Sequence, residues 1–215
     1  MNPRIKISIL LMASTCFLAT VKGQHISTDV QAIDHWQLVN RTATRVLEKN
    51  SVRLSQAAGD GMMILKGADM GDGTIELDIK GSHEMQQSFV GVAFHIQNPT
   101  TFDAVYFRPF NFKSNEALRR GHGVQYISMP NYDWEKLRNE FPGKYEHEIF
   151  PAPDPDEWFH VKIVLKGIHV SVYVNNERQP SLEVDRISRA THGGLGLWVG
   201  NNSPGSFAHF NFYPM

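Results

Sequence analysis

Several segments in the middle of the chain place small residues beside side chains that can bind a polar ring. In the run 89–97, Gly91 and Ala93 alternate with bulkier residues and leave space beside His95. Large planar or hydrogen-bonding side chains recur at alternate positions of the following segments: Tyr106, Arg108, Gln125 and Trp198. An aromatic ring stacks on the C–H face of a sugar, while Arg, Gln and His side chains satisfy hydroxyl groups with directional hydrogen bonds. These residue types on one face favour a concave surface that binds a saccharide.

Each of these residues also has a purely structural interpretation. His95 is typical of a half-buried sheet histidine, and Trp198 is typical of a packing residue under a loop. The argument for a site depends on their sharing one face. A slip of one residue in strand register would move the whole set to the other face of the sheet.

A second candidate is the pair of carboxylates Glu76 and Asp78. Retaining glycoside hydrolysis uses two carboxyl groups about 5–5.5 Å apart. The alternative is two solvent-facing charges on a half-buried strand. If the protein is an enzyme, we expect His95 or Glu76 to transfer the proton and Arg108 to hold a developing negative charge, with Asp78 binding substrate.

The ten histidines do not form a tight metal-binding motif. His122 lies between two glycines, and Glu146-His147-Glu148 concentrates charge in a predicted loop. Scattered surface histidines explain this pattern, and a transition-metal site assembled from distant strands is the alternative.

The elements that carry these residues are predicted strands. Thr74–Lys80 alternates strictly, with Ile75, Leu77 and Ile79 on one face. Similar strands are expected over 89–97, 104–109, 124–128, 158–166, 169–174, 195–200 and 207–212. The segment 131–141 instead has a helical stripe, with Asn131 as the expected cap. The pattern predicts an all-β sandwich of two antiparallel sheets with one short helical insertion.

The first residues are predicted to be a signal peptide. Arg4 and Lys6 precede an apolar run from Ile7 to Val21, and cleavage is expected after Gly23. The run is short for a membrane span, which needs about 20 residues, and an uncleaved anchor is the alternative. The only cysteine, Cys16, would leave with this segment. We therefore expect one extracytoplasmic domain, periplasmic or secreted, over 24–215, with no membrane insertion.

Composition excludes one class of partner. Lys and Arg number 21 against 22 Asp and Glu, so no basic field exists to bind nucleic acid. The oligomeric state is left open.

Two groups of segments carry a resemblance to known proteins. The segment 157–164, followed by 170–175, resembles paired strands of concanavalin A-like (laminin-G-like) domains, and 194–198 with 207–210 is similar to their closing strands. Within that superfamily, Thr74–Lys80, Val105–Arg108 and 123–127 resemble strands of the 3-keto-disaccharide hydrolase family. The resemblance covers roughly residues 60–212.

The resemblance implies a concanavalin A-like jelly roll and a carbohydrate-related role. A glycan-recognising or glycan-processing domain is the first expectation; a hydrolase acting on a disaccharide or 3-keto-disaccharide is the alternative, and a structural or adhesion module is the third. The Glu76-Leu77-Asp78 segment resembles part of the family-16 glucanase motif, but Gly81 stands where its last acid belongs. A laminarinase-type activity is therefore not predicted. No cofactor is expected, although loops with Asp69, Asp72 and Asp103 are consistent with structural calcium in such a fold.

Overall fold

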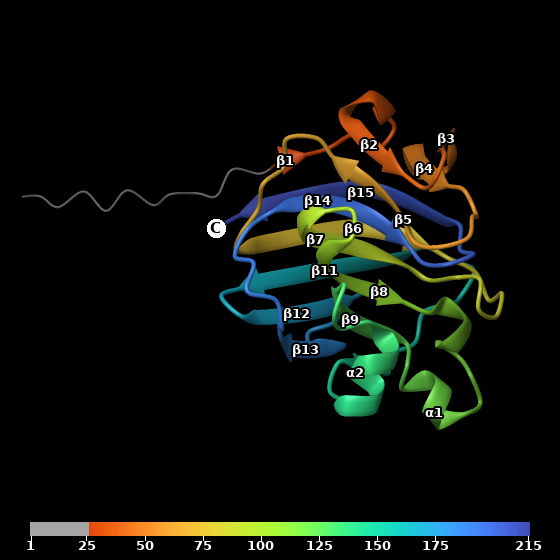
Figure 1. Cartoon of the computed structure of the whole chain (residues 1–215). Helices are drawn as coiled ribbons and strands as arrows, with labels where there is room; N and C mark the ends of the chain where they lie inside the picture. Colours follow the sequence, from red (N-terminus) through yellow and green to blue (C-terminus); the bar gives the residue numbers. More distant parts are fainter. Residues whose placement is uncertain (1–25) are drawn as a thin grey trace, which may run out of the picture.

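Two antiparallel β-sheets pack face to face in the computed structural model, which describes residues 26–215 (Figure 1). The predicted signal peptide lies outside the described residues. The eight-stranded sheet has the order β13-β12-β11-β6-β15-β4-β3, with β1 beside β15, and the seven-stranded sheet has the order β10-β9-β8-β7-β14-β5-β2. The predicted jelly-roll sandwich is confirmed.

The eight-stranded sheet contains β1 (Ile26–Ser27), β3 (Ala43–Val46), β4 (Ser51–Leu54), β6 (Gly73–Lys80), β11 (Phe159–Lys166), β12 (His169–Val174), β13 (Leu182–Asp185) and β15 (Gly205–Pro214). The seven-stranded sheet contains β2 (Trp36–Val39), β5 (Gly61–Leu65), β7 (Val90–Asn98), β8 (Thr101–Phe107), β9 (Val124–Met129), β10 (Glu146–His147) and β14 (Gly194–Val199).

The core lies between the sheets and is filled by alternate residues of their strands. Ile75, Leu77 and Ile79 of β6 are fully buried, as the alternating pattern predicts. On the facing sheet, Val92 of β7 and Leu197 of β14 are paired across the strands and are also fully buried. Burial of such faces removes apolar surface from water, and this is the main contribution to the stability of the sandwich.

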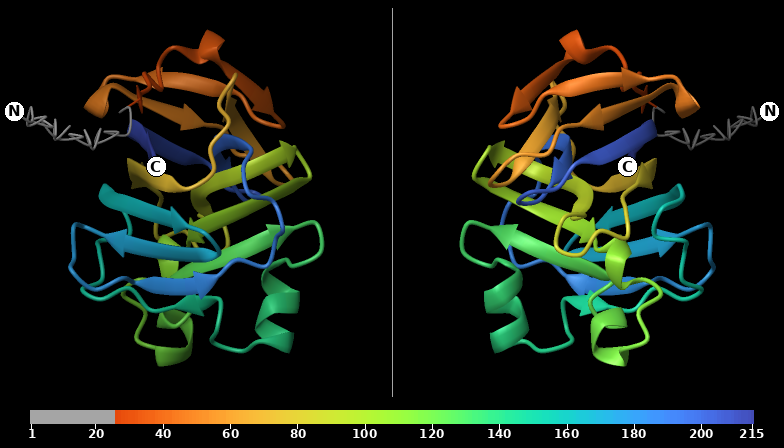
Figure 2. Two further views of the ribbon diagram at one scale, coloured as in Figure 1. Left: turned by 90° about the vertical axis from the view of Figure 1, so that its left-hand side faces the viewer. Right: turned by 90° about the vertical axis from the view of Figure 1, so that its right-hand side faces the viewer.

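Two short α-helices, α1 (Ala117–Arg120) and α2 (Trp134–Glu140), lie beside β8 and β9 at one end of the molecule (Figure 2). The expected cap of α2 was wrong by two residues. Asp133 is the cap, because its Oδ1 accepts a 2.8 Å hydrogen bond from the backbone N–H of Lys136. Asn131 instead lies in a turn that is closed by a bridge between Ser128 and Tyr132.

Within residues 26–215, no helix has the length and apolar character that a membrane span requires.

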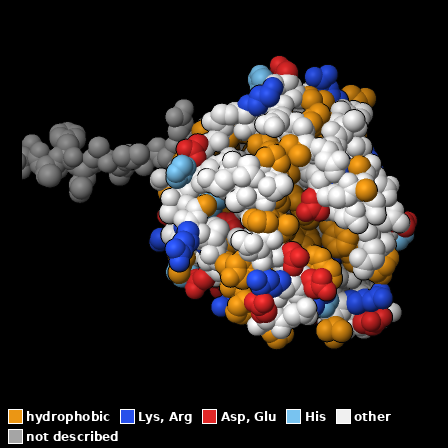
Figure 3. Space-filling model, viewed as in Figure 1, with side chains coloured by type: hydrophobic (Ala, Val, Ile, Leu, Met, Phe, Trp, Pro, Cys, Tyr) orange, Lys and Arg blue, Asp and Glu red, His pale blue; other side chains and the backbone are white. Residues whose placement is uncertain are grey.

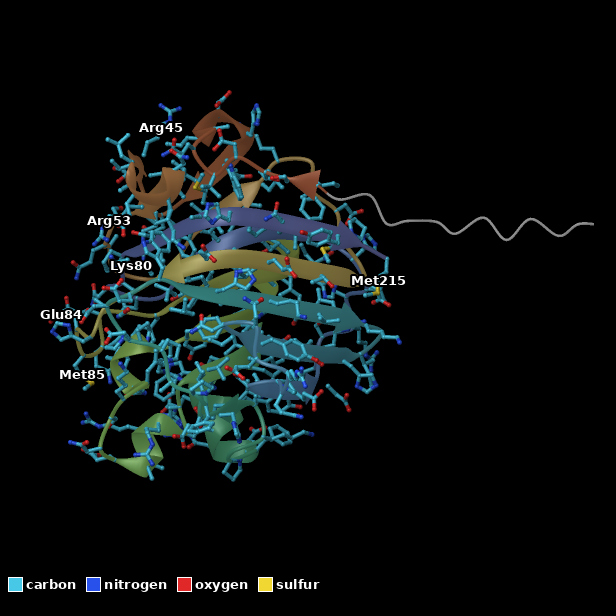
Figure 4. All side chains as sticks on the ribbon, turned by 180° about the vertical axis from the view of Figure 1, so that it is seen from behind. Arg45, Arg53, Lys80, Glu84, Met85 and Met215 are labelled. Atoms are coloured by element: carbon cyan, nitrogen blue, oxygen red, sulfur yellow. The ribbon has the colours of Figure 1, made fainter. Side chains whose placement is uncertain are left out.

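The outer face of the eight-stranded sheet is open and carries a compact polar cluster around Asp78 (Figure 4 shows this face, with Lys80 at the end of β6). Asp78 accepts hydrogen bonds from Lys49 Nζ at 2.7 Å and from the Nδ1 atoms of His160 and His209, each at 2.9 Å. Burial raises the pKa of Asp78, but the three hydrogen bonds outweigh it and hold that pKa well below its usual range. The carboxylate therefore stays charged and connects β6, β11, β15 and the turn that carries Lys49.

Replacement of Asp78 by Asn is expected to lower the free energy of unfolding at pH 7 by about 2–3 kcal/mol, since hydrogen bonds to charged groups contribute roughly 1.5–3 kcal/mol. The folded-state pKa of Asp78 is lowered, so its contribution is complete above the unfolded value of about 3.9 and is lost as the pH falls further. The stability difference between the wild-type protein and Asp78→Asn should therefore be smaller at pH 3 than at pH 7 in urea denaturation.

The matched control for this experiment is Asp185→Asn. Asp185 also pairs with one histidine, His169, but both side chains are more than half exposed. Exposed pairs of this kind contribute about 0–1 kcal/mol. A stability loss in Asp78→Asn no larger than in Asp185→Asn would contradict the role of the cluster.

Candidate functional site

A pocket of about 620 Å³ opens on the outer face of the seven-stranded sheet. Its floor lies over β8, β9 and β14, and its walls come from α1, α2 and the loops 81–89 and 200–202. In the space-filling view, hydrophobic side chains gather in a hollow on this face, with charged side chains around it (Figure 3). The pocket is therefore an apolar hollow with a charged border.

Two aromatic side chains, Trp198 and Tyr106, contact each other on the floor, with ring centroids 5.0 Å apart. Gly91 is paired with both of them, with Trp198 on one side and with Tyr106 on the other. A Cβ atom at Gly91 would stand 2.2 Å from the carbonyl oxygen of Val105. Glycine is therefore required at position 91 of β7, between the strands that carry Tyr106 and Trp198.

Tyr106, Arg108 and Gln125 form one hydrogen-bonded group beside the floor. Arg108 Nη2 donates to Tyr106 Oη and to Gln125 Oε1, each at 2.5 Å, and Tyr106 Oη donates to Gln125 Oε1 at 2.9 Å. Burial raises the pKa of Tyr106 to about 12, so its hydroxyl is neutral at ordinary pH. Four predicted binding residues, Tyr106, Arg108, Gln125 and Trp198, are thus brought together on one face.

A buried carboxylate, Glu146, holds the wall behind this group. Its oxygens accept hydrogen bonds from Arg138 Nε at 2.8 Å and Arg138 Nη2 at 2.6 Å, which is a bidentate pair. His122 Nδ1 lies 2.9 Å from the same carboxylate, and Arg108 Nη1 lies 3.8 Å from it. The sequence shows a charged run at Glu146, but nothing in it predicts that Glu146 lies beside Arg108.

His122 and Asp60, which also line the pocket, have shifted pKa values as well. Partial burial lowers the pKa of His122, although the neighbouring Glu146 opposes the shift, so the imidazole is neutral at pH 7. Partial desolvation raises the pKa of Asp60, which lies at the exposed border of the pocket, against the opposing effects of Arg41 and the backbone N–H of Asn201. Titratable groups with shifted pKa values in a cleft are candidates for proton transfer. Neither residue was among the predicted catalytic groups.

His95 lies on the wrong face for the expected site. A bulge between Phe94 and Asn98 breaks the pairing of β7 with β8, and His95 adopts a φ of 49° within it. The side chain is buried, with Nδ1 3.3 Å from Asp103 Oδ2. The bulge reverses the alternation that starts at Gly91, so the face predicted for His95 was wrong.

Glu76 and Asp78 lie on β6 of the other sheet, and the pocket contains neither of them. Asp78 was expected to bind substrate with Tyr106 and Trp198, but the two groups lie on opposite layers of the sandwich. The catalytic roles expected for His95 and Glu76 stay predictions, and the structure places both residues away from the pocket.

The three aspartates that suggested calcium do not form a common site. Both oxygens of Asp103 are engaged, because they accept hydrogen bonds from Tyr126 Oη and Ser188 Oγ. Asp72 accepts from the backbone N–H of Gly167, and Asp69 pairs with His192. Across the part of the chain that the structure describes, no group of three or more His, Cys, Asp or Glu side chains is arranged to hold a metal ion. These residues do not fit a calcium site.

Solved structures with the same sandwich include carbohydrate-binding and hydrolase-like proteins. The carbohydrate-binding module CBM66 from Bacillus subtilis aligns with a TM-score of 0.61 and 16% identity, over 82% of this chain and 93% of that chain. A putative glycosyl hydrolase from Parabacteroides distasonis gives a TM-score of 0.60 and 11% identity, over 89% and 100% of the two chains. The VIP36 exoplasmic/lumenal domain, in a Ca²⁺/Man3GlcNAc-bound form, gives 0.54 and 11%, over 85% and 86%. At these identities the likeness shows the fold alone.

A search of curated proteins gives no match to this chain. A family model, in contrast, matches residues 27–209, which is most of the described chain. The match agrees with the resemblance seen in the order of the strands. This protein belongs to the family of the 3-keto-alpha-glucoside-1,2-lyase-like domain.

Proposed function

We propose that this protein binds a saccharide in the pocket over β8, β9 and β14. The observation that carries the proposal is the contact between the Trp198 and Tyr106 rings beside the Arg108–Gln125 hydrogen-bonding group. A sugar has apolar C–H faces and a rim of hydroxyl groups, so it needs an aromatic surface and directional polar groups together. The pocket offers both within one hollow of about 620 Å³, a size typical of small-molecule sites.

The exposed Trp134 on α2 extends the aromatic surface to the border of the pocket. Its ring is positioned by Arg138, whose guanidinium carbon lies 5.1 Å from the ring centroid. A volume well above that of one hexose suits a ligand of more than one ring. The carbohydrate-related names of the structural neighbours support this proposal, as does the family match.

We also propose an extracytoplasmic location, from the signal-peptide pattern at the start of the sequence.

A second candidate is catalysis on a 3-keto glycoside, and the shifted pKa values of Asp60 and His122 favour it. A ketone at C3 acidifies the proton at C2. A base removes that proton, the C–H electrons form the C1=C2 double bond through an enolate, and the aglycone oxygen leaves C1 with a proton from an acid. Asp60 and neutral His122 are the two groups available for these transfers, and Arg108 and Arg138 would stabilise the enolate charge.

Trp134→Ala is expected to weaken saccharide binding about twofold to tenfold, because one aromatic stacking contact contributes roughly 0.5–1.5 kcal/mol. The measurement is isothermal titration with a panel of mono- and disaccharides. Trp134 is 46% exposed, so its loss should not disturb folding. Trp158→Ala is the matched control: Trp158 lies before β11 on the other sheet, beside Lys49. If Trp134→Ala and Trp158→Ala weaken saccharide binding equally, the saccharide binds outside this pocket.

For the catalytic candidate, Asp60→Asn and His122→Gln are each expected to reduce kcat on a 3-keto glucoside by about 10²–10⁴, the usual contribution of a general acid or base. Product formation is followed by the absorbance of the unsaturated ketone. With neutral His122 as the base and Asp60 as the acid, the rate should fall as the pH rises through the raised pKa of the Asp60 carboxyl. A fall in turnover in Glu76→Gln, with Asp60→Asn and His122→Gln fully active, would move the chemistry to the other sheet.

A further inference from the structure

The wall of the pocket contains more positive than negative charge. Arg108 is 5% exposed and Glu146 is 4% exposed, so both are largely removed from water. Glu146 gives its two oxygens to the bidentate pair with Arg138. Two guanidinium groups, which are always protonated, therefore share one carboxylate.

Arg108 is the group that lacks its own counterion. Its hydrogen bonds go to neutral acceptors, namely Tyr106 Oη, Gln125 Oε1 and the backbone carbonyl of His122. The nearest carboxylate oxygen, on Glu146, is 3.8 Å away. Burial lowers the pKa of Arg108, and the charge of Arg138 acts in the same direction. A buried cation without a full partner is costly unless a ligand supplies the missing charge.

One other donor at the pocket lacks an acceptor. The indole Nε1 of Trp198 is buried and has no hydrogen-bond partner within residues 26–215. Arg119, on α1, lines the same pocket and makes an exposed ion pair with Glu116 at 3.3 Å. The pocket is thus rich in donors on the side of Arg108 and α1, which suits a ligand rich in acceptor atoms.

The acidic side chains that line the pocket already have partners of their own. Asp133 caps α2 through its Oδ1 atom. The Asp60 carboxylate is bound by the backbone N–H of Asn201 and interacts with Arg41. Neither is paired with Arg108 in the structure, so the positive charge of that wall remains available to a ligand.

We propose that the pocket selects a saccharide that carries a carboxylate, such as a uronic acid, and that Arg108 and Arg138 bind this group. This inference rests on the proposed saccharide site and specifies its ligand class. Arg138 uses Nε and Nη2 on Glu146, and Arg108 uses Nη2 on Tyr106 and Gln125. The remaining N–H groups of the two guanidinium groups bind the carboxylate, by charge-assisted hydrogen bonds. The aromatic floor then holds the sugar ring, and the wall holds the acid.

The experiment compares sugars that differ only at this group. Methyl glucoside is titrated against methyl glucuronide, and methyl galactoside against methyl galacturonide, into the purified protein at low ionic strength. We expect the acid of at least one pair to bind about tenfold to a hundredfold more tightly, because a hydrogen bond to a charged group is worth that factor.

Two substitutions should change this preference in opposite directions. Arg138→Gln frees Glu146 to neutralise Arg108, so the ratio of acid to neutral-sugar affinity should fall to near one, whatever the change in overall affinity. Glu146→Gln removes the only shared counterion, so the preference should increase. Arg45→Gln, on β3 of the other sheet (labelled in Figure 4), is the matched control and should keep the wild-type ratio. Circular dichroism checks that each variant is folded, and Arg119→Gln, at an exposed position, gives a milder test with the same sign as Arg138→Gln.

The outcomes separate this inference from the proposed function. Equal binding of acid and neutral sugars would overturn the carboxylate proposal and leave the saccharide site intact. A preference for the acid that persists in both Arg138→Gln and Arg119→Gln would also overturn it, because the acid would then be bound elsewhere. If no sugar of either kind binds, the saccharide site itself is wrong.

Discussion

The arrangement of the pocket depends on the ion pairs of one buried carboxylate, Glu146. Its bidentate pair with Arg138 ties α2 to β10, and its approach to His122 and Arg108 ties both to the turn before β9 and to the end of β8. A carboxylate this deeply buried requires such partners, since the cost of desolvation is otherwise several kcal/mol. The guanidinium groups have the same requirement. The short helices and turns around the pocket are therefore held by mutual neutralisation of these charges in addition to apolar packing, such as that of Leu137 on α2.

The two outer faces of the sandwich use polar groups differently. On the eight-stranded sheet, Asp78 is surrounded by three donors and is fully satisfied, and the cluster is open to solvent. On the seven-stranded sheet, Arg108 is shielded by α1, α2 and two loops, and its hydrogen bonds do not neutralise its charge. A satisfied cluster stabilises the fold, whereas an incompletely neutralised one in a pocket is poised to bind. This contrast explains why the pocket is a better candidate for the ligand-binding site than the Asp78 cluster, although both faces carry residue types that are common in binding sites.

The sequence predicted the parts of the site that follow regular strand geometry. Tyr106, Gln125 and Trp198 were placed correctly because alternation continues without interruption along β8, β9 and β14. His95 was misplaced because one bulge in β7 reverses the alternation, and the sequence around it has no glycine to mark the irregularity. Glu146 and Arg138 were not recognised, since a two-residue strand and a seven-residue helix carry too little periodicity to fix their direction. The strands before residue 66 were also not identified, because they are short and their exposed residues obscure the pattern.

Three departures from local rules lie at the pocket. At Gly91 the backbone of β8 leaves no room for a side chain. Trp198 has a buried indole N–H without a hydrogen-bond partner, and Arg108 shares its counterion with Arg138. The unpaired N–H and the shared counterion each reduce stability relative to an apolar replacement of similar size. The large core between the sheets tolerates such a loss, because the free energy of folding comes mainly from the apolar faces of β6, β7, β11 and β14. Sequences satisfy local rules nearly everywhere except where function requires otherwise. The coincidence of three such departures in one hollow is thus an argument for a ligand there that is independent of any relative.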